Sequence, residues 1–204
     1  MAVYVFLNDD YSDWELGYIL PSLISEAVDS RIKKRNYEVI SFSLQLPSIR
    51  SQGSLKITPD STIKNIDVEN IEALILPGGT FWSTLSAPIL DELVLKVVGR
   101  KKILAAICAA TGYLAKLKLL DSIAHTSNSL EFLKNQTTEY LGEANYKNEL
   151  AVSHNGIITA SGLGAVDFTD KILRELEVFE PRISDAWLKA YKYGLDPFRK
   201  DTEN

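Results

Sequence analysis

The chain has 204 residues, with 22 basic and 27 acidic side chains and a formal net charge of −5. This length predicts one domain with a core large enough to need no metal or disulfide staple. The acidic balance argues against nucleic acid or an anionic membrane as the main partner, because both bind basic surfaces. Cys108 is the single cysteine, so no intrachain disulfide can form and we expect a reducing compartment.

The sequence carries no sign of a membrane segment or an export signal. Its longest apolar runs, 71–77 and 103–108, are far shorter than the about 20 residues that cross a bilayer. Residues 1–7 lack the basic region of a signal peptide and are typical of a buried strand. We therefore expect a cytoplasmic protein.

Short apolar runs alternate with longer amphipathic stretches in the first half of the chain. Continuous β-rich runs predict strands buried on both faces, and apolar residues at helical spacing predict helices. We expect strands at 2–7, 37–43 and 73–76, helices at 14–30 and 88–98, and a hairpin around Gln52-Gly53 within 49–58.

The second half continues the alternation. We expect strands at 103–107 and 124–127, helices at 110–117, 130–134, 165–176 and 184–193, and a hairpin over 151–160 that turns at Asn155-Gly156. This order predicts an α/β fold, a three-layer sandwich with a flavodoxin-like, mostly parallel sheet, helices on both faces and a small β-hairpin. We assign 1–180 to this domain and 181–204 to a C-terminal helical extension of the same domain with a tail. In such folds the site lies at the carboxyl ends of the strands.

One strand end has the pattern of a nucleophile elbow. Cys108 stands where the strand at 103–107 turns directly into a helix, and such a turn needs small residues two positions before and after the nucleophile. Ala106 and Ala110 meet this need. The start of a helix favours a thiolate, so we predict a Cys108 pKa below the free value of about 8.5. A cysteine buried only for packing is the alternative interpretation.

Three other strand ends carry unusual residues. Gly78 and Gly79 follow a buried strand, where they allow backbone amides to approach a ligand and form an oxyanion hole, or form a plain tight turn. Glu15 follows the first strand, either as an acid over the same crevice or as an acid in the first turn of a helix. The fourth end runs from His125 to Asn128.

Together these strand ends resemble the DJ-1/PfpI (ThiJ/PfpI) superfamily, which shares its fold with class I glutamine amidotransferase domains. The resemblance spans 2–176 and rests on LILPGG at 74–79, ILAAICAA at 103–110, LLD at 119–121 and NGIITASG at 155–162. It implies that Cys108 is the reactive cysteine and Glu15 the acid beside its sulfur. The same resemblance implies that the amides of Gly79 and Ala109, with Gly78 in the same turn, line an oxyanion hole.

The histidines of the family are missing at two positions. Protease-like members carry a histidine directly after the cysteine, where this chain has Ala109, and DJ-1-like members carry one at the position of Asn128. His125 faces away from the crevice if the strand alternates, and His154 adjoins a turn, so we expect both to be structural. Asn128 and His125 remain candidates for lining the site, but a Cys–His pair is not expected.

Three functions agree with these residues. The first is a cysteine hydrolase, protease-like or amidotransferase-like as in a bacterial subgroup of the family, or a glyoxalase- or deglycase-like enzyme, acting on a small carbonyl or amide. The second is a redox-responsive protein that senses through oxidation of Cys108. The third is a non-catalytic small-molecule binder. We expect no metal and no cofactor, and we expect a homodimer, which the family commonly forms.

Overall fold

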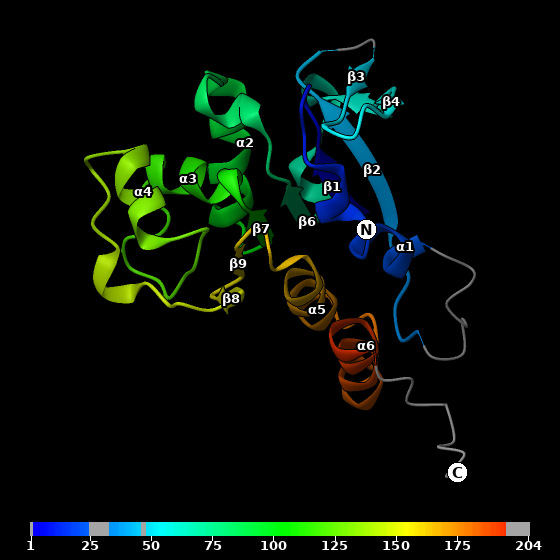
Figure 1. Cartoon of the computed structure of the whole chain (residues 1–204). Coiled ribbons are helices and arrows are strands. Elements are labelled where there is room, and N and C mark those ends of the chain that lie inside the picture. The colour runs from blue at the N-terminus through cyan, green and yellow to red at the C-terminus, as the bar shows by residue number, and fades with distance from the viewer. Residues whose placement is uncertain (1, 25–32, 46–47, 195–204) are drawn as a thin grey trace, which may run out of the picture.

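The structure, a computed structural model, describes residues 2–24, 33–45 and 48–194 (Figure 1). A seven-stranded sheet runs through its centre in the order β5-β2-β1-β6-β7-β9-β8. All neighbouring strands are parallel except β9 and β8, which pair antiparallel as a hairpin. The strands are β1 (Ala2–Phe6), β2 (Glu38–Ser43), β5 (Ser61–Thr62), β6 (Ile71–Leu76), β7 (Ile103–Ile107), β8 (Ala151–His154) and β9 (Ile157–Ala160).

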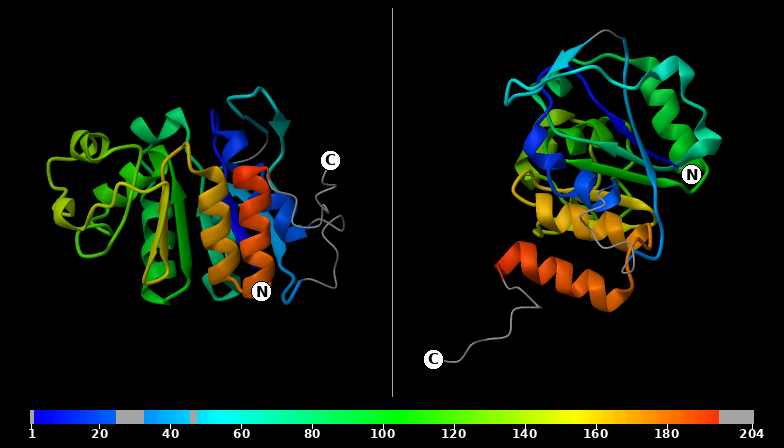
Figure 2. Two further views of the ribbon diagram at one scale, coloured as in Figure 1. Left: turned by 60° about the horizontal axis from the view of Figure 1, so that its bottom comes forward. Right: turned by 90° about the vertical axis from the view of Figure 1, so that its right-hand side faces the viewer.

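Helices cover both faces of this sheet, so the predicted α/β sandwich is confirmed. Figures 1 and 2 show α2 and α3 on one face and α1, α5 and α6 on the other. The α-helices are α1 (Ile19–Ile24), α2 (Pro88–Gly99), α3 (Ala109–Lys116), α4 (Leu130–Gln136), α5 (Ala165–Glu175) and α6 (Pro181–Tyr193). Short 3-10 helices are η1 (Asp13–Leu16), η2 (Ile63–Asn65), η3 (Val68–Asn70), η4 (Thr80–Ser83) and η5 (Glu143–Asn145).

The core lies on both sides of the central strands. Every residue of β1 is buried, as a strand enclosed by helices requires. Aromatic rings extend this core below the glycine turn that follows β6: Phe6 contacts Phe42, Phe81 and Trp82. The indole of Trp82 donates a hydrogen bond to the Pro77 carbonyl at 2.8 Å, which fixes the start of the turn.

The hairpin predicted at 49–58 forms a separate two-stranded sheet, β3 (Ile49–Arg50) and β4 (Lys56–Ile57). Carboxylates from the loop after β1 hold it in place. The Arg50 amide donates to Asp9 at 2.8 Å, and the Ser51 hydroxyl donates to Asp13 at 2.5 Å. The hairpin therefore lies beside the carboxyl end of β1, where the site was expected.

Two expected elements differ from the structure. The segment 124–127 is no strand but makes a single bridge, at His125 with Tyr146. Its polar groups are satisfied by other partners, because the Thr126 amide donates to the Thr159 hydroxyl at 2.8 Å and the Thr126 hydroxyl donates to a carbonyl. The helix expected at 14–30 is interrupted between η1 and α1, and its portion from 25 on lies outside the described residues.

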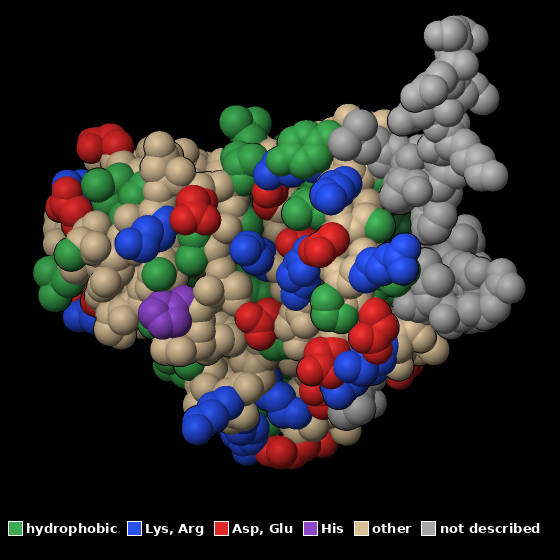
Figure 3. Space-filling view, turned by 90° about the horizontal axis from the view of Figure 1, so that it is seen from below, with side chains coloured by type: hydrophobic (Ala, Val, Ile, Leu, Met, Phe, Trp, Pro, Cys, Tyr) green, Lys and Arg blue, Asp and Glu red, His purple; other side chains and the backbone are tan. Residues whose placement is uncertain are grey.

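Helix α6 packs against α5 rather than standing apart from the domain. Arg174 of α5 pairs with Asp170 on its own helix at 2.9 Å and with Asp185 of α6 at 2.8 Å. Figure 3 views the molecule from this side and shows acidic and basic side chains interspersed. The C-terminal tail that we expected from 199 lies outside the described residues.

Within the described ranges, the longest helices are too short and too polar to pass through a lipid bilayer.

Candidate active site

Cys108 occupies the sharp corner between β7 and α3. Strand β7 ends at Ile107 and α3 begins at Ala109, so Cys108 alone makes the turn. Its backbone has φ 59° and ψ −125°, a conformation that a side-chain-bearing residue adopts only under strain. The Cys108 amide donates to the Ala160 carbonyl at 2.9 Å and its carbonyl accepts from Thr111. The corner has the geometry of a nucleophile elbow.

Two glycines allow the backbone to approach this corner. A Cβ on Gly78 would lie 2.7 Å from the Cβ of Cys108 and 2.8 Å from an oxygen of Glu15. A Cβ on Gly162 would lie 3.0 Å from the Cys108 sulfur. A side chain at either glycine would therefore displace its neighbours. The backbone thus approaches the Cys108 side chain from two sides.

Glu15 is the acidic residue closest to the thiol, and it is fully buried (0% exposed). Its Oε2 accepts a hydrogen bond from the Gly78 amide at 2.6 Å, whereas its Oε1 has no hydrogen-bond partner among the described residues. Burial raises the pKa of Glu15 to about 7, although hydrogen bonds from Gly78 and from the Cys108 thiol favour the ionised form. Glu15 therefore exchanges its proton near neutral pH.

The thiol does not have the lowered pKa that the helix start predicted. Burial raises the pKa of Cys108, and the negative charge of Glu15 raises it further. Hydrogen bonds to the sulfur from Asn128 and from the Ala109 amide act in the opposite direction but are weaker. The prediction was wrong because the hydrogen bond from the first amide of α3, even together with that from Asn128, does not outweigh burial and the charge of Glu15.

The Asn128 side chain contacts the sulfur and the glycine loop together. Its amide nitrogen donates to Cys108 Sγ at 3.4 Å, and its amide oxygen accepts from the Gly162 amide at 2.9 Å. Of the expected backbone donors, Gly79 and Ala109 lie at the pocket over Cys108. The Gly78 amide instead donates to Glu15 and is not free to hold an oxyanion.

Neither histidine belongs to this site. His125 is fully buried (0% exposed), and its ring bonds the Ile123 carbonyl at 2.7 Å and the Tyr140 hydroxyl at 2.6 Å. Burial lowers the pKa of His125, so it is a neutral structural residue. His154 accepts a hydrogen bond from the Ala124 amide at 2.7 Å. His125, a candidate for lining the site, is thus not part of it.

We expect His125→Ala to lower the free energy of unfolding by about 2–4 kcal/mol, because it leaves a cavity and removes the partner of the buried Tyr140 hydroxyl. Urea unfolding measures this loss, and the rate of Cys108 alkylation should stay close to that of wild type. His154→Ala, at a half-buried position, serves as the control with a smaller loss. A slowed alkylation with unchanged stability would contradict the structural role.

A pocket of about 400 Å³ opens over Cys108. The sequence analysis identified Gly79, Cys108 and Ala109 but not the other walls, most of which come from η1, η4, α4 and the β3–β4 hairpin rather than from strand ends. Trp14 adjoins Glu15 in the sequence, and this is the signal by which it could have been found. The lining residues are Ser12, Trp14, Gln52, Gly79, Thr80, Trp82, Ser83, Cys108, Ala109, Phe132 and Gln136.

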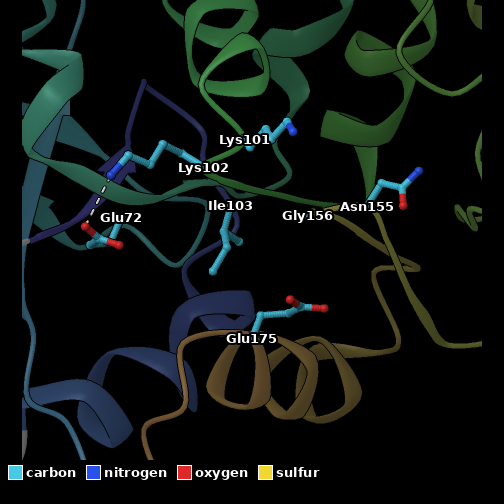
Figure 4. A pocket seen from close by; sticks show the side chains of 7 residues that line it. All are labelled: Glu72, Lys101, Lys102, Ile103, Asn155, Gly156 and Glu175. Carbon is cyan, nitrogen blue, oxygen red and sulfur yellow. Dashed lines mark hydrogen bonds and ion pairs between the residues drawn. The ribbon is translucent and has the colours of Figure 1, made fainter.

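A larger pocket, of about 690 Å³, lies at the opposite, amino-terminal end of the strands (Figure 4). Glu72, Lys102 and Glu175 are among its walls, and Lys102 pairs with Glu72 at 3.3 Å. No thiol lines it, its charges are mixed, and Lys102 is held in the ion pair with Glu72. Among the described residues no group of three His, Cys, Asp or Glu side chains is placed to hold a metal ion. The Cys108 pocket is therefore the candidate active site.

Comparisons with known proteins agree with this geometry. The sequence model of the DJ-1/PfpI family matches residues 1–175. "Uncharacterized protease YoaZ" of Bacillus subtilis (strain 168) is 34% identical, over 93% of this chain and 90% of its own. The crystal structure of a thiJ/pfpI family protein from Bacillus anthracis superposes with a TM-score of 0.89, at 33% identity, over 95% of this chain and 91% of that chain.

A more distant relative bears a specific enzyme name. "Glutathione-independent glyoxalase DJR-1.2" of Caenorhabditis elegans is 29% identical over 60% of this chain and 64% of its own. The family model covers most of the chain, and the relative YoaZ is 34% identical over 93% of it. The chain therefore belongs to the DJ-1/PfpI family.

Proposed function

We propose that the protein is a cysteine-dependent enzyme that converts small 2-oxoaldehydes to 2-hydroxy acids, with Cys108 as nucleophile and Glu15 as acid and base. One observation carries this proposal: the carboxyl of Glu15 is fully buried beside Cys108, and this burial raises its pKa to about 7. A group that titrates near the working pH is the most effective proton carrier. Addition to an aldehyde requires such a carrier beside the sulfur.

The chemistry begins with transfer of the thiol proton to Glu15 as Cys108 Sγ bonds to the aldehyde carbon. The carbonyl electron pair moves onto oxygen, and we assign stabilisation of this charge to the amides of Gly79 and Ala109, two residues that line the pocket. A proton then moves from that carbon to the neighbouring carbonyl carbon through an enediol. The proton that Glu15 took from the thiol passes to the oxygen of this neighbouring carbon, which leaves a thioester of the 2-hydroxy acid and an ionised Glu15. Water hydrolyses the thioester, releases the 2-hydroxy acid and restores the thiol.

Peptide hydrolysis is less well supported, even though a relative is named a protease. It requires a residue that first accepts the proton of the nucleophile and then donates it to the leaving amine. Histidine usually has this role. Position 109 is alanine, and His125 and His154 are bound elsewhere. We therefore assign the pocket a small carbonyl substrate rather than a polypeptide.

A second candidate function is redox sensing through Cys108. The unpartnered Oε1 of Glu15 favours it, because a protonated carboxyl could donate to an oxygen added to the sulfur. Each step would consume one hydrogen peroxide and release one water, through sulfenic to sulfinic acid. The raised pKa of Cys108 acts against this function, since the thiolate is the form that peroxide oxidises.

Incubation with methylglyoxal tests the proposal. We expect catalytic formation of the hydroxy acid, lost by at least about 100-fold in Cys108→Ser, because the hydroxyl is a far weaker nucleophile at this pH. Thermal melts of both proteins check folding. Disappearance of methylglyoxal without hydroxy acid would contradict the proposal, and a stable gain of about 32 Da on Cys108 after substoichiometric peroxide would favour the sensor.

A further inference from the structure

We infer that an apolar pocket beside Cys108, walled by Trp14, Tyr18 and Leu163, is a subsite for an aromatic or branched apolar substituent of the electrophile that reacts at the thiol. The inference deepens the proposed function and rests on it only for the identity of the reaction. The binding preference itself is a property of the pocket and can be measured with simple thiol reagents.

The pocket has the size and chemistry of a small-molecule subsite. Its volume is about 570 Å³, within the usual range for ligand sites. No charged side chain lines it: the walls are Trp14, Gly17, Tyr18, Gly162, Leu163, Ala165 and Val166. Trp14 is 53% exposed and Leu163 is 90% exposed, so two large apolar side chains face solvent here without cover within the described chain.

The pocket adjoins the pocket over Cys108. Trp14 is a wall both of this pocket and of the pocket over Cys108. Gly162 is a wall as well, and its missing side chain leaves the backbone so close that a Cβ would lie 3.0 Å from Sγ. A reagent bonded to Sγ can therefore extend its substituent past Trp14 into the apolar pocket.

Helix α6 supports the far wall. The Tyr18 ring packs edge-on against Tyr191, with centroids 5.5 Å apart, and Tyr191 packs on Trp187 at 4.7 Å. The helix thus holds the Tyr18 ring in one orientation. This contact gives the C-terminal helix, which lies outside the family match at 1–175, a part in shaping the site.

The charges near the pocket agree with an apolar occupant. Asp167, which follows Val166 in α5, forms an ion pair with Lys192 of α6 and so is already partnered. A charged substituent would lose its water in the pocket and gain no opposite charge in return. An apolar substituent would instead bury surface against an indole and a phenol ring.

The test compares two thiol reagents, iodoacetamide and its N-phenyl derivative, by their second-order rates of Cys108 alkylation. The measured ratio is the rate with the N-phenyl reagent divided by the rate with iodoacetamide. We expect this ratio in wild type to exceed the ratio for glutathione by about tenfold, and we expect Trp14→Ala to lower it most of the way to the glutathione value. Trp14→Phe should keep part of the excess. Tyr191→Ala should lower the ratio more mildly, and Leu95→Ala, an exposed apolar side chain on α2, should leave it unchanged.

Three outcomes would overturn the inference. The first is a rate ratio in wild type equal to that of glutathione. The second is a rate ratio in Trp14→Ala equal to that of wild type. Alternatively, Trp14→Ala could convert a dimer to a monomer in light scattering at an unchanged ratio, which would show that a second copy occupies the pocket. If the ratio falls as expected while methylglyoxal is not converted, the subsite stands and the proposed reaction fails.

Discussion

Glu15→Gln is expected to stabilise the folded chain at pH 8 by up to about 3 kcal/mol relative to wild type, and by little at pH 4. The Glu15 pKa is raised to about 7 by burial, above its ordinary value of 4.5. Between these values the folded chain binds a proton that the unfolded chain has lost. The stability of wild type is therefore fully present below pH 4.5 and falls as the pH rises through 7.

Urea unfolding of both proteins at pH 4 and pH 8 measures this effect, because glutamine has no charge to bury. Glu92→Gln, on an exposed face of α2, is the control and should show no such pH-dependent gain. Glu15→Gln should also slow methylglyoxal conversion by about 100-fold or more, since glutamine cannot carry the proton. An equal stability difference at both pH values would show that the carboxylate is not the cause.

Asn128→His is expected to raise Cys108-dependent conversion of a carbonyl substrate by about 100-fold and to add a pH dependence near the histidine value of about 6.5. The Asn128 amide lies 3.4 Å from the Cys108 sulfur, so an imidazole at this position reaches the same proton. In wild type, the proposed mechanism assigns that proton to Glu15. The measurement is a pair of pH–rate profiles on the two purified proteins.

The control for this variant is Asn128→Ala, which removes the contact with Gly162 without adding a base. Because the Asn128 oxygen accepts from the Gly162 amide at 2.9 Å, we expect a lower melting temperature in both variants. A gain in rate restricted to the histidine variant separates base catalysis from loop movement. No gain, with the same loss of stability in both, would show that position 128 serves only to anchor the loop.

Local patterns predicted the fold and the corner well. The small residues around Cys108 and the glycines after β6 are short-range requirements of a strand-to-helix turn, so the sequence displays them directly. The pKa of Cys108 could not be obtained in this way, because it depends on burial and on Glu15, a residue 93 positions away in the chain. The walls formed by Trp14, Tyr18 and Leu163 likewise depend on how distant loops meet.

The prediction of secondary structure was wrong where side chains, rather than backbone groups of a neighbouring strand, make the hydrogen bonds. The alternation at 124–127 is that of a strand, yet the hydroxyls of Thr126 and Thr159 take up hydrogen bonds that a ladder would have used. At the interruption between η1 and α1, the Glu15 side chain of η1 accepts a hydrogen bond from the Gly78 amide, a partner 63 positions away that helix periodicity could not indicate.

The backbone at Cys108 has a consequence for protein engineering. Glycine adopts its φ of 59° without penalty, whereas a residue with a side chain loses about 1–3 kcal/mol of folding free energy there. A cysteine needed only to fill space would sit at an unstrained position instead. Directed evolution for heat resistance alone would consequently favour glycine at 108, and the most thermostable descendants of this chain would be those without a thiol.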